Sequence, residues 1–380
     1  MDVIISNSTY YELGLFVILS ISLLVQLVYY LFIFIRIPLH KGYAKSDSEN
    51  HVPVSVVICA RNEEKNLENF LPFILEQDYP EFEVVVVNDC SSDDSEFLLD
   101  RLSKKYSRLK VTTIKQDEKF SHNKKLALTV GIKSARYDWL LLTDADCKPE
   151  SNKWIQSVAK HFTDDNEIVL GYGGFFSKSG FLNKLIRFDG LFIAMQYLSY
   201  TLINRPYMGV GRNLAYRRSL FFKNKGFATH AHIESGDDDL FINEVATRSN
   251  TRVEFCHDSH IRTIARDAFR RWVFQKRRHI TTGPKYKGAS KLLISGEIIS
   301  RVLFYGSAIA LLSIQYFPLV ILSVILFRWM VQLVIIKQVM NRLNERKILL
   351  ILLIYDISSL FFYGLLATLN RFTVKKSPWR

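Results

Sequence analysis

Long apolar runs lie at both ends of the chain, and a polar, mixed-charge stretch separates them. Residues 14–35 are almost wholly apolar, and about 20 such residues in a helix span the hydrocarbon core of a bilayer. Three further runs, 298–314, 317–336 and 348–369, predict two or three membrane helices, because the first run contains Arg301. The pattern therefore predicts a multi-pass membrane protein with a large polar domain between its spans.

Basic residues beside these runs predict how the chain is oriented. Arg36, Lys41 and Lys45 follow the first run, so the positive-inside rule places the amino terminus outside and the central domain in the cytoplasm. The loop 337–347 carries four Lys or Arg residues and should be cytoplasmic as well. The basic tail 370–380 would then lie outside, against the same rule. Either the tail departs from the positive-inside rule, or one of the apolar segments lies at the membrane interface and does not cross the membrane.

In the central stretch, short β-branched runs alternate with helical periodicity. The pattern predicts strands at 54–59, 82–87, 109–114 and 139–142, with helices at 62–76 and 123–134. Such alternation predicts an α/β domain with a mostly parallel sheet, whose ligands gather beyond the carboxyl ends of the strands. Asn62, Asp89 and Asp144 each follow a strand, so we expect them at one edge.

The predicted domains follow from these patterns: 1–36 a tail and membrane helix, 37–51 a linker, 52–290 the cytoplasmic domain with interfacial helices, 297–369 the remaining spans, and 370–380 a basic tail.

The net charge of +13 favours binding to anionic lipid or to phosphorylated substrates. Without zinc-finger spacing or an RNA-binding aromatic signature, no nucleic acid partner is expected. The four cysteines form no C-x-x-C pair, which favours free thiols in a reducing compartment.

Acidic residues cluster at two places in this domain. Asp144 and Asp146 flank one alanine at the end of a strand, where two carboxylates can hold Mg²⁺ or Mn²⁺ together with substrate phosphates. The alternative is a solvated turn. Residues 237–239 are three consecutive aspartates after a glycine. These carboxylates repel one another unless screened, and the ordinary interpretation is a charged helix amino terminus. Asp89 alone is typical of a turn or helix cap.

The stretch 270–279 combines five Lys or Arg residues with aromatic ones. It predicts either an amphipathic helix on anionic lipid or a cationic clamp on a diphosphate, and different faces of one helix can serve both.

Residues 181–203 mix apolar and charged positions. This pattern favours two interpretations equally, a helix at the membrane interface and an amphipathic helix of the protein core. In the membrane runs, Arg328 and Asp356 should lie at the same depth and face each other, because unpaired charges there are costly.

Taken in order, these features resemble family 2 glycosyltransferases, in the membrane-bound branch that includes cellulose, chitin, hyaluronan and poly-N-acetylglucosamine synthases. The resemblance covers about 52–283 and the flanking helices. It implies a nucleotide-diphospho-sugar transferase domain of the GT-A-like class and a divalent cation, Mg or Mn. It also implies a nucleotide-sugar donor, a UDP-sugar by resemblance, and a lipid or saccharide acceptor, in polysaccharide or glycolipid biosynthesis. Membrane lipids and a membrane partner subunit are the further partners expected.

The resemblance also assigns roles to residues. Donor binding falls to Ala60, Arg61, Asn62, Glu63, Asp89, Lys124, Asp144, Gln275 and Arg278. The metal falls to Asp146, the family's usual direct ligand, with Asp144 beside it. Acceptor binding falls to Gly211, Arg212, Asn213 and His279. The catalytic base falls to Asp237, with Asp238 as a rival.

Three positions depart from the family pattern. Gly236 stands where an acidic residue often precedes the base, and Asn123 replaces a common glycine. His279 replaces the tryptophan of Q-x-x-R-W, which favours short products or single additions because imidazole stacks less on a sugar. Beside Arg277 and Arg278 it should also resist protonation. The expected reaction is an inverting transfer, and the alternatives are a processive synthase or a catalytically silent membrane subunit.

Overall fold

A mostly parallel sheet forms the centre of the domain in the computed structural model, which describes residues 2–42, 51–115 and 123–372. The seven strands lie in the order β3-β2-β1-β4-β8-β6-β9, and only β8 runs antiparallel to its neighbours. Their bounds are β1 Val54–Ala60, β2 Phe82–Asp89, β3 Leu109–Ile114, β4 Trp139–Asp144, β6 Ile168–Gly171, β8 Leu214–Arg217 and β9 Thr251–Glu254. The four strands predicted from the sequence are confirmed as β1 to β4.

A second, three-stranded sheet lies beside the end of β4, in the order β5-β10-β7. Its strands are β5 Cys147–Pro149, β7 Gly173–Phe175 and β10 Ile261–Thr263. Because β5 begins three residues after β4 ends, the tight turn between the two strands carries Asp146. The predicted metal ligands thus lie where the two sheets meet.

Helices cover both faces of the large sheet. On one face lie α3 Glu64–Leu75, α4 Ser95–Lys105 and α6 Trp154–Ala159, and on the other α5 Lys124–Ser134, α7 Phe181–Leu202, α8 Arg218–Lys223 and α9 Asp239–Val245. The strand side chains alternate between these faces: Val56 and Ile58 pack under α3, whereas Val57 packs under α5. A Cβ added to Gly131 of α5 would lie 2.7 Å from Val57, so glycine is needed for this close approach.

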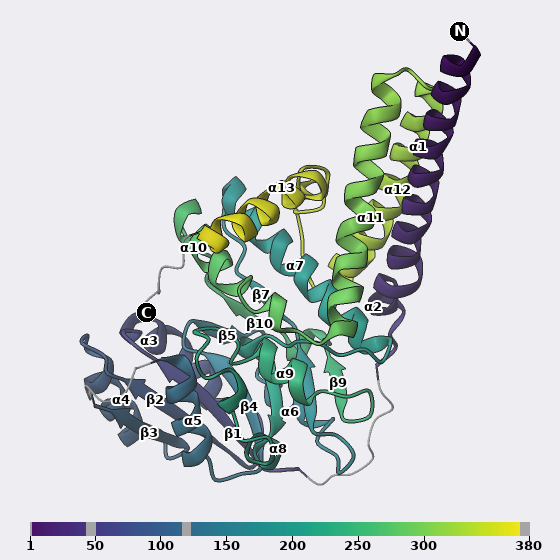
Figure 1. Ribbon diagram of the computed structural model, residues 1–380. Helices are drawn as coiled ribbons and strands as arrows, with labels where there is room; N and C mark the ends of the chain where they lie inside the picture. The colour runs from purple at the N-terminus through teal and green to yellow at the C-terminus, as the bar shows by residue number, and fades with distance from the viewer. Residues whose placement is uncertain (1, 43–50, 116–122, 373–380) are drawn as a thin grey trace.

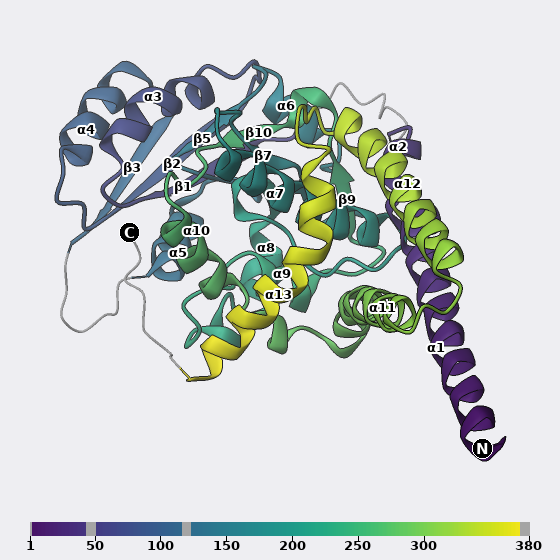
Figure 2. The same cartoon turned by 90° about the horizontal axis from the view of Figure 1, so that it is seen from above.

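Four helices are long and apolar enough to cross a membrane. The first is α1 Asp2–Val28, continued by the π-helical η1 Tyr29–Phe34 and by α2 Arg36–Leu39; the others are α11 Gly288–Ser313, α12 Pro318–Arg342 and α13 Ile351–Phe372. In Figure 1, α1, α11 and α12 rise together from the domain. Helix α13 instead runs across α7 and α10 Phe269–His279, as the view from above also shows (Figure 2). The predicted basic tail lies almost wholly outside the described residues.

The membrane helices and the domain share one hydrophobic core. Phe34 at the end of the first span and Val339 near the end of α12 belong to the same buried cluster as Phe188 and Phe192 of α7. Phe192 also packs against Tyr355 of α13, with 5.6 Å between the ring centroids. Helix α7 is therefore a core helix that joins the sheet to the membrane helices.

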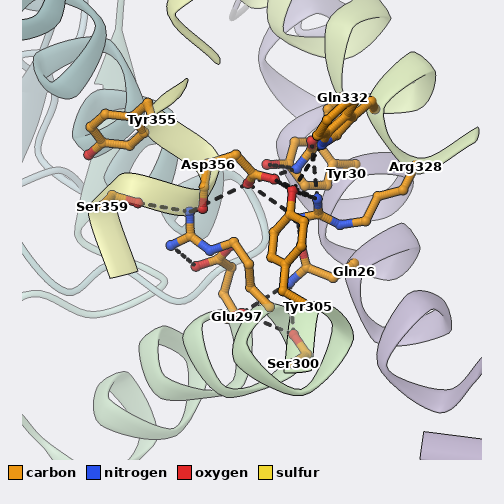
Figure 3. Close-up of polar contacts among 12 residues, drawn as sticks. Gln26, Tyr30, Glu297, Ser300, Tyr305, Arg328, Gln332, Tyr355, Asp356 and Ser359 are labelled. Carbon is orange, nitrogen blue, oxygen red and sulfur yellow. Dashed lines mark hydrogen bonds and ion pairs between the residues drawn. The ribbon is translucent and has the colours of Figure 1, made fainter. Parts of the chain in front are cut away.

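A polar network lies inside the membrane helices (Figure 3). The Nη1 atom of Arg328 lies 2.6 Å from Oδ2 of Asp356, so the predicted pairing of these two charges is confirmed. Arg328 also donates to Oε1 of Gln26 in α1, at 2.7 Å, and Gln332 donates to the hydroxyl of Tyr30. The network ties α1, α12 and α13 together, and each charge in it has an opposite charge beside it.

Candidate active site

A cavity of about 970 Å³ opens at the carboxyl ends of β1 and β4 and reaches helices α11 and α13. Predicted site residues from distant parts of the chain line it: Arg61, Glu63, Lys124, Asp144, Asp146, Gly211, Arg212, Asp237, Asp238, Gln275, Arg278 and His279. The expected convergence at one edge of the sheet is thus present. Ala60, Asn62, Asp89 and Asn213 are not among the described residues that line the cavity.

Three of those four residues are buried, and the fourth, Asn62, is exposed. Ala60 and Asp89 are fully buried at the ends of β1 and β2. Asn62 accepts a hydrogen bond from the backbone N–H of Ser92 at 2.7 Å, which joins the loops after the two strands. The amide of Asn213 donates to two backbone carbonyl oxygens, and its oxygen accepts from the indole of Trp154. The side chains of Asn62 and Asn213 thus hold neighbouring backbone segments together.

Lys124 lies at the centre of the carboxylates. It is the first residue of α5, and Asn123 caps this helix by accepting from the N–H of Leu126 at 2.9 Å. Its Nζ atom lies 2.8 Å from Oδ1 of Asp144 and 3.2 Å from Oδ2 of Asp237. Burial alone would lower the pKa of Lys124, but these two carboxylates raise it well above its ordinary value. One ammonium group therefore forms ion pairs with two carboxylates.

The D-x-D turn offers a compact set of ligand atoms. Oxygens of Asp144 and Asp146 and the sulfur of Cys147 all lie within 4.8 Å of one another. Burial and then the neighbouring Asp144 raise the pKa of Asp146. A divalent cation would relieve this repulsion, and carboxylate oxygens are the ligands that Mg²⁺ and Mn²⁺ prefer. The residues fit such a cation. Sequence reasoning missed Cys147, which is buried as a strand residue.

The three consecutive aspartates point to three different partners. Gly236 before them has φ +97°, and a Cβ there would lie 2.5 Å from Leu240, so an acidic residue at this position would be strained. Asp237 faces Lys124 in the cavity. Asp238 caps α9 and accepts from the N–H of Gly211 at 2.8 Å, and burial followed by its two acidic neighbours raises its pKa to about 7.

Asp239 accepts from the hydroxyls of Thr282 and Tyr286, so it anchors the segment after α10. Of the three carboxylates, Asp237 is thus the one directed at the predicted donor-side lysine, while the other two hold backbone segments in place. The helix-terminus interpretation is also correct, since α9 begins at Asp239.

Helix α10 turns the charges of its last turn toward the cavity, whereas Arg270 and Arg271 at its start are exposed. The residues of the last turn that line the cavity are Gln275, Lys276, Arg278 and His279. Loss of surrounding water and then the cations Lys276 and Arg278 lower the pKa of His279 well below its ordinary value, which confirms that it resists protonation. The ammonium of Lys276 pairs with the buried Asp189 of α7. The sequence did not reveal this pairing, because the two residues lie far apart in the chain.

The sheet and its carboxylate-bearing edge define a GT-A-like fold of the nucleotide-diphospho-sugar transferase class. The chain superposes with a TM-score of 0.58 on the mannosyltransferase PcManGT from Pyrobaculum calidifontis, which was solved with GDP-Man and Mn²⁺. That match has 16% sequence identity and covers 88% of this chain and 98% of the other. The family described as "Glycosyl transferase family 2" matches residues 55–223. The predicted fold class and the predicted resemblance to this family are confirmed.

Named relatives agree with the family. Over 131 residues the chain is 29% identical to the poly-beta-1,6-N-acetyl-D-glucosamine synthase of Staphylococcus epidermidis, which is 34% of this chain and 30% of the relative. Over 107 residues it is 30% identical to the 4,4'-diaponeurosporenoate glycosyltransferase of Staphylococcus aureus, covering 28% and 27% of the two chains. The chain thus matches about a third or less of each relative's length. The two relatives differ in what their names say they make, although both are glycosyltransferases.

Proposed function

We propose that this protein is an inverting glycosyltransferase of the cytoplasmic membrane face, which moves a sugar from a UDP-sugar or a similar donor to a lipid-linked or saccharide acceptor. The observation that carries the proposal is the placement of Lys124 between Asp144 and Asp237, inside one cavity. This arrangement brings a cation, a candidate metal ligand and a candidate base to the same point. The family 2 domain supports the reaction class.

In the proposed reaction, Asp237 takes the proton from an acceptor hydroxyl as that oxygen attacks the anomeric carbon of the donor. The bond from this carbon to the diphosphate oxygen breaks, and the nucleoside diphosphate leaves with the electron pair. Lys124 and Arg278 line the cavity and would balance the charge that develops on the diphosphate. A divalent cation held by Asp146 and Asp144 would supply further positive charge there. Asp238 would keep the Gly211 loop in place for the acceptor.

We further propose that α1, α11 and α12 cross the membrane and that α13 lies along its surface. The exposed large apolar residues of α13 fall on one face at helical spacing: Ile354, Ile357, Phe361, Leu365 and Leu369. The opposite face packs on α7 and α10. With three spans, the basic tail and the loop 337–347 lie on the same cytoplasmic side, which satisfies the positive-inside rule.

A carboxyl-terminal reporter tests this topology. The reporter should be protected from external protease and active in the cytoplasm, on the side of the catalytic domain. External exposure of the reporter would mean that α13 crosses the membrane as a fourth span.

The reaction is tested with a donor panel. Several UDP- and GDP-sugars are incubated with the full, detergent-solubilised protein and its native lipid extract, and release of the nucleoside diphosphate is measured. We expect one donor to be used in preference and a divalent cation to be required. Absence of turnover with every donor would favour the silent-subunit alternative. Sizing of the product then separates single additions from a processive polymer.

A further inference from the structure

The cavity continues from the donor side into the membrane helices. We propose that this membrane end binds an uncharged, hydroxyl-bearing part of the acceptor, and not a lipid phosphate or diphosphate. The proposal rests on the transfer reaction proposed above and adds the chemical class of the acceptor. The residues that form this end are Glu297, Ile298 and Arg301 of α11 and Tyr355, Ser359 and Tyr363 of α13.

Glu297 and Arg301 offer hydrogen-bonding atoms that the protein does not use. The two side chains are 0% and 4% exposed and pair with each other, with Nη2 of Arg301 3.3 Å from Oε2 of Glu297. Oε1 of Glu297 and Nε of Arg301 are buried without a hydrogen-bond partner among the described residues. A carboxylate oxygen accepts and a guanidinium donates, whereas a hydroxyl group does both. An entering hydroxyl would therefore satisfy either atom.

A third unused group belongs to α10. The indole of Trp272 lines the cavity and is 3% exposed, and its N–H has no hydrogen-bond partner within the described part of the chain. Its ring stacks on Phe362 of α13, with 4.9 Å between centroids, which fixes its orientation. Buried polar groups are normally paired in folded proteins. Three such groups around one end of one cavity therefore point to a ligand.

The charges at this end favour a neutral ligand. The two buried cations that line this end are each matched by a carboxylate, Arg301 by Glu297 and Lys276 by Asp189. Arg328, outside the lining, pairs with Asp356. Recognition of a phosphate uses cations that are free to give it charge-assisted hydrogen bonds. A phosphate here would have to compete with carboxylates already in contact with these cations. An uncharged polyhydroxy group meets no such repulsion.

Apolar side chains complete the walls. Phe192 and Ile193 of α7 and Ile294 and Ile298 of α11 line the cavity beside the polar atoms. Apolar and aromatic surfaces beside a few fixed polar groups are typical of sites for sugar rings and other amphipathic ligands. The ligand chemistry is thus a neutral hydroxyl-rich group, carried either by a membrane glycolipid or by a growing saccharide.

The test compares acceptors and two tryptophan variants of the full-length protein. Transfer is measured with a neutral glycolipid, a neutral oligosaccharide and a polyprenyl phosphate, alongside hydrolysis of the donor without acceptor. Ile298→Trp fills the membrane end of the cavity, and Ile309→Trp is its control on the same helix, at a site 66% exposed that does not line the cavity. We expect Ile298→Trp to reduce transfer to the neutral acceptor by at least about 10-fold through steric blockage. Transfer and donor hydrolysis should both stay near the wild-type rates in Ile309→Trp.

A second variant changes the charge alone. Glu297→Gln leaves Arg301 without its carboxylate partner in α11, so it should raise the KM for the neutral acceptor by about 10-fold and improve the use of polyprenyl phosphate. Loss of a purely structural contact would not reverse the preference between acceptors. Should this variant fail to fold, the Ile298→Trp result decides the matter, because Ile298 is 41% exposed and tolerates change.

Two results would overturn the proposal while leaving the transfer reaction standing: wild-type transfer to polyprenyl phosphate in preference to both neutral acceptors, or unchanged neutral transfer in Ile298→Trp. Between the two neutral acceptors, the preferred one identifies whether lipid or saccharide carries the hydroxyl group. If the wild type cleaves no nucleotide sugar at all, the proposed function fails and this inference fails with it.

Discussion

The two ends of the cavity differ in how their carboxylates are paired with cations. At the donor end, Asp144 and Asp237 share the ammonium group of Lys124, and Asp146 adds a further carboxylate beside them. At the membrane end, Glu297 pairs with Arg301 of the same helix, and the pair Arg328–Asp356 lies beside it in the network outside the cavity lining. The donor end therefore gathers three carboxylates around one shared ammonium group, whereas each of these two carboxylates near the membrane end has an arginine of its own. The first arrangement suits chemistry on a charged donor, and the second suits stability and a neutral ligand.

The largest effect is expected from the donor-end base. Asp237→Asn should lower turnover by about 10² or more with little change in donor affinity, because the amide cannot take the acceptor proton. The measurement is kcat and donor KM with the preferred nucleotide sugar. Asp238→Asn is the matched comparison, since its side chain can still accept from Gly211. If activity is lost in Asp238→Asn and kept in Asp237→Asn, the catalytic base is Asp238 and not Asp237.

The carboxylates of the D-x-D turn should come next. Asp146→Ala should weaken both metal and donor binding, since a cation held there would bridge carboxylate and diphosphate. Calorimetric titration of Mn²⁺ and of the donor measures the two affinities separately. Cys256→Ala serves as the control, because it removes a free thiol that is not part of this group of ligand atoms. Full activity in excess chelator would remove the metal from the site.

At the membrane end the expected effect is on stability. Arg328→Met leaves Asp356 without its closest cation and should cost about 3–5 kcal/mol, as for other broken buried ion pairs. Thermal unfolding in detergent measures the loss, and Lys337→Met, an exposed cation of the same helix, should be nearly silent. The double variant Arg328→Met with Asp356→Leu should recover part of the loss. Wild-type stability of Arg328→Met alone would show that the network contributes nothing.

The smallest change is expected at His279, which lines the cavity. His279→Trp should lengthen the products modestly, because an indole offers a broader ring for stacking a sugar. Gel or mass analysis of product length is the measurement. Long polymer made already by the wild-type protein would refute the expectation of weak processivity.

The sequence predicted the donor end far better than the membrane end. Strands β1 to β4 and the D-x-D turn follow from local patterns, because hydrophobic periodicity and turn-forming residues can be recognised within a short stretch of sequence. The pairing of Arg328 with Asp356 was also predictable, because these are opposite charges inside apolar runs, where an unpaired charge is costly. The separate partners of Asp238 and Asp239 were not, since Gly211, Thr282 and Tyr286 lie far from them in the chain.

Helix α13 shows why the rest remained hidden. Its composition is that of a membrane span, and the surface position proposed for it rests on its packing across α7 and α10. Likewise, Arg301 counted against a membrane helix in the sequence, yet in the structure Glu297 lies one turn before it and pairs with it. A charged residue inside an apolar run therefore shows whether the run can be a membrane helix only when its ion-pair partner is known.

The stereochemistry of donor cleavage tests the central claim most directly. The wild-type protein is incubated with its preferred α-linked donor, and proton NMR follows the anomer of the sugar first released to water. Direct attack assisted by Asp237 predicts that the β-anomer appears first and then equilibrates, and that Asp237→Asn abolishes its appearance. Initial release of the α-anomer would contradict single displacement and, with it, the role given to Asp237.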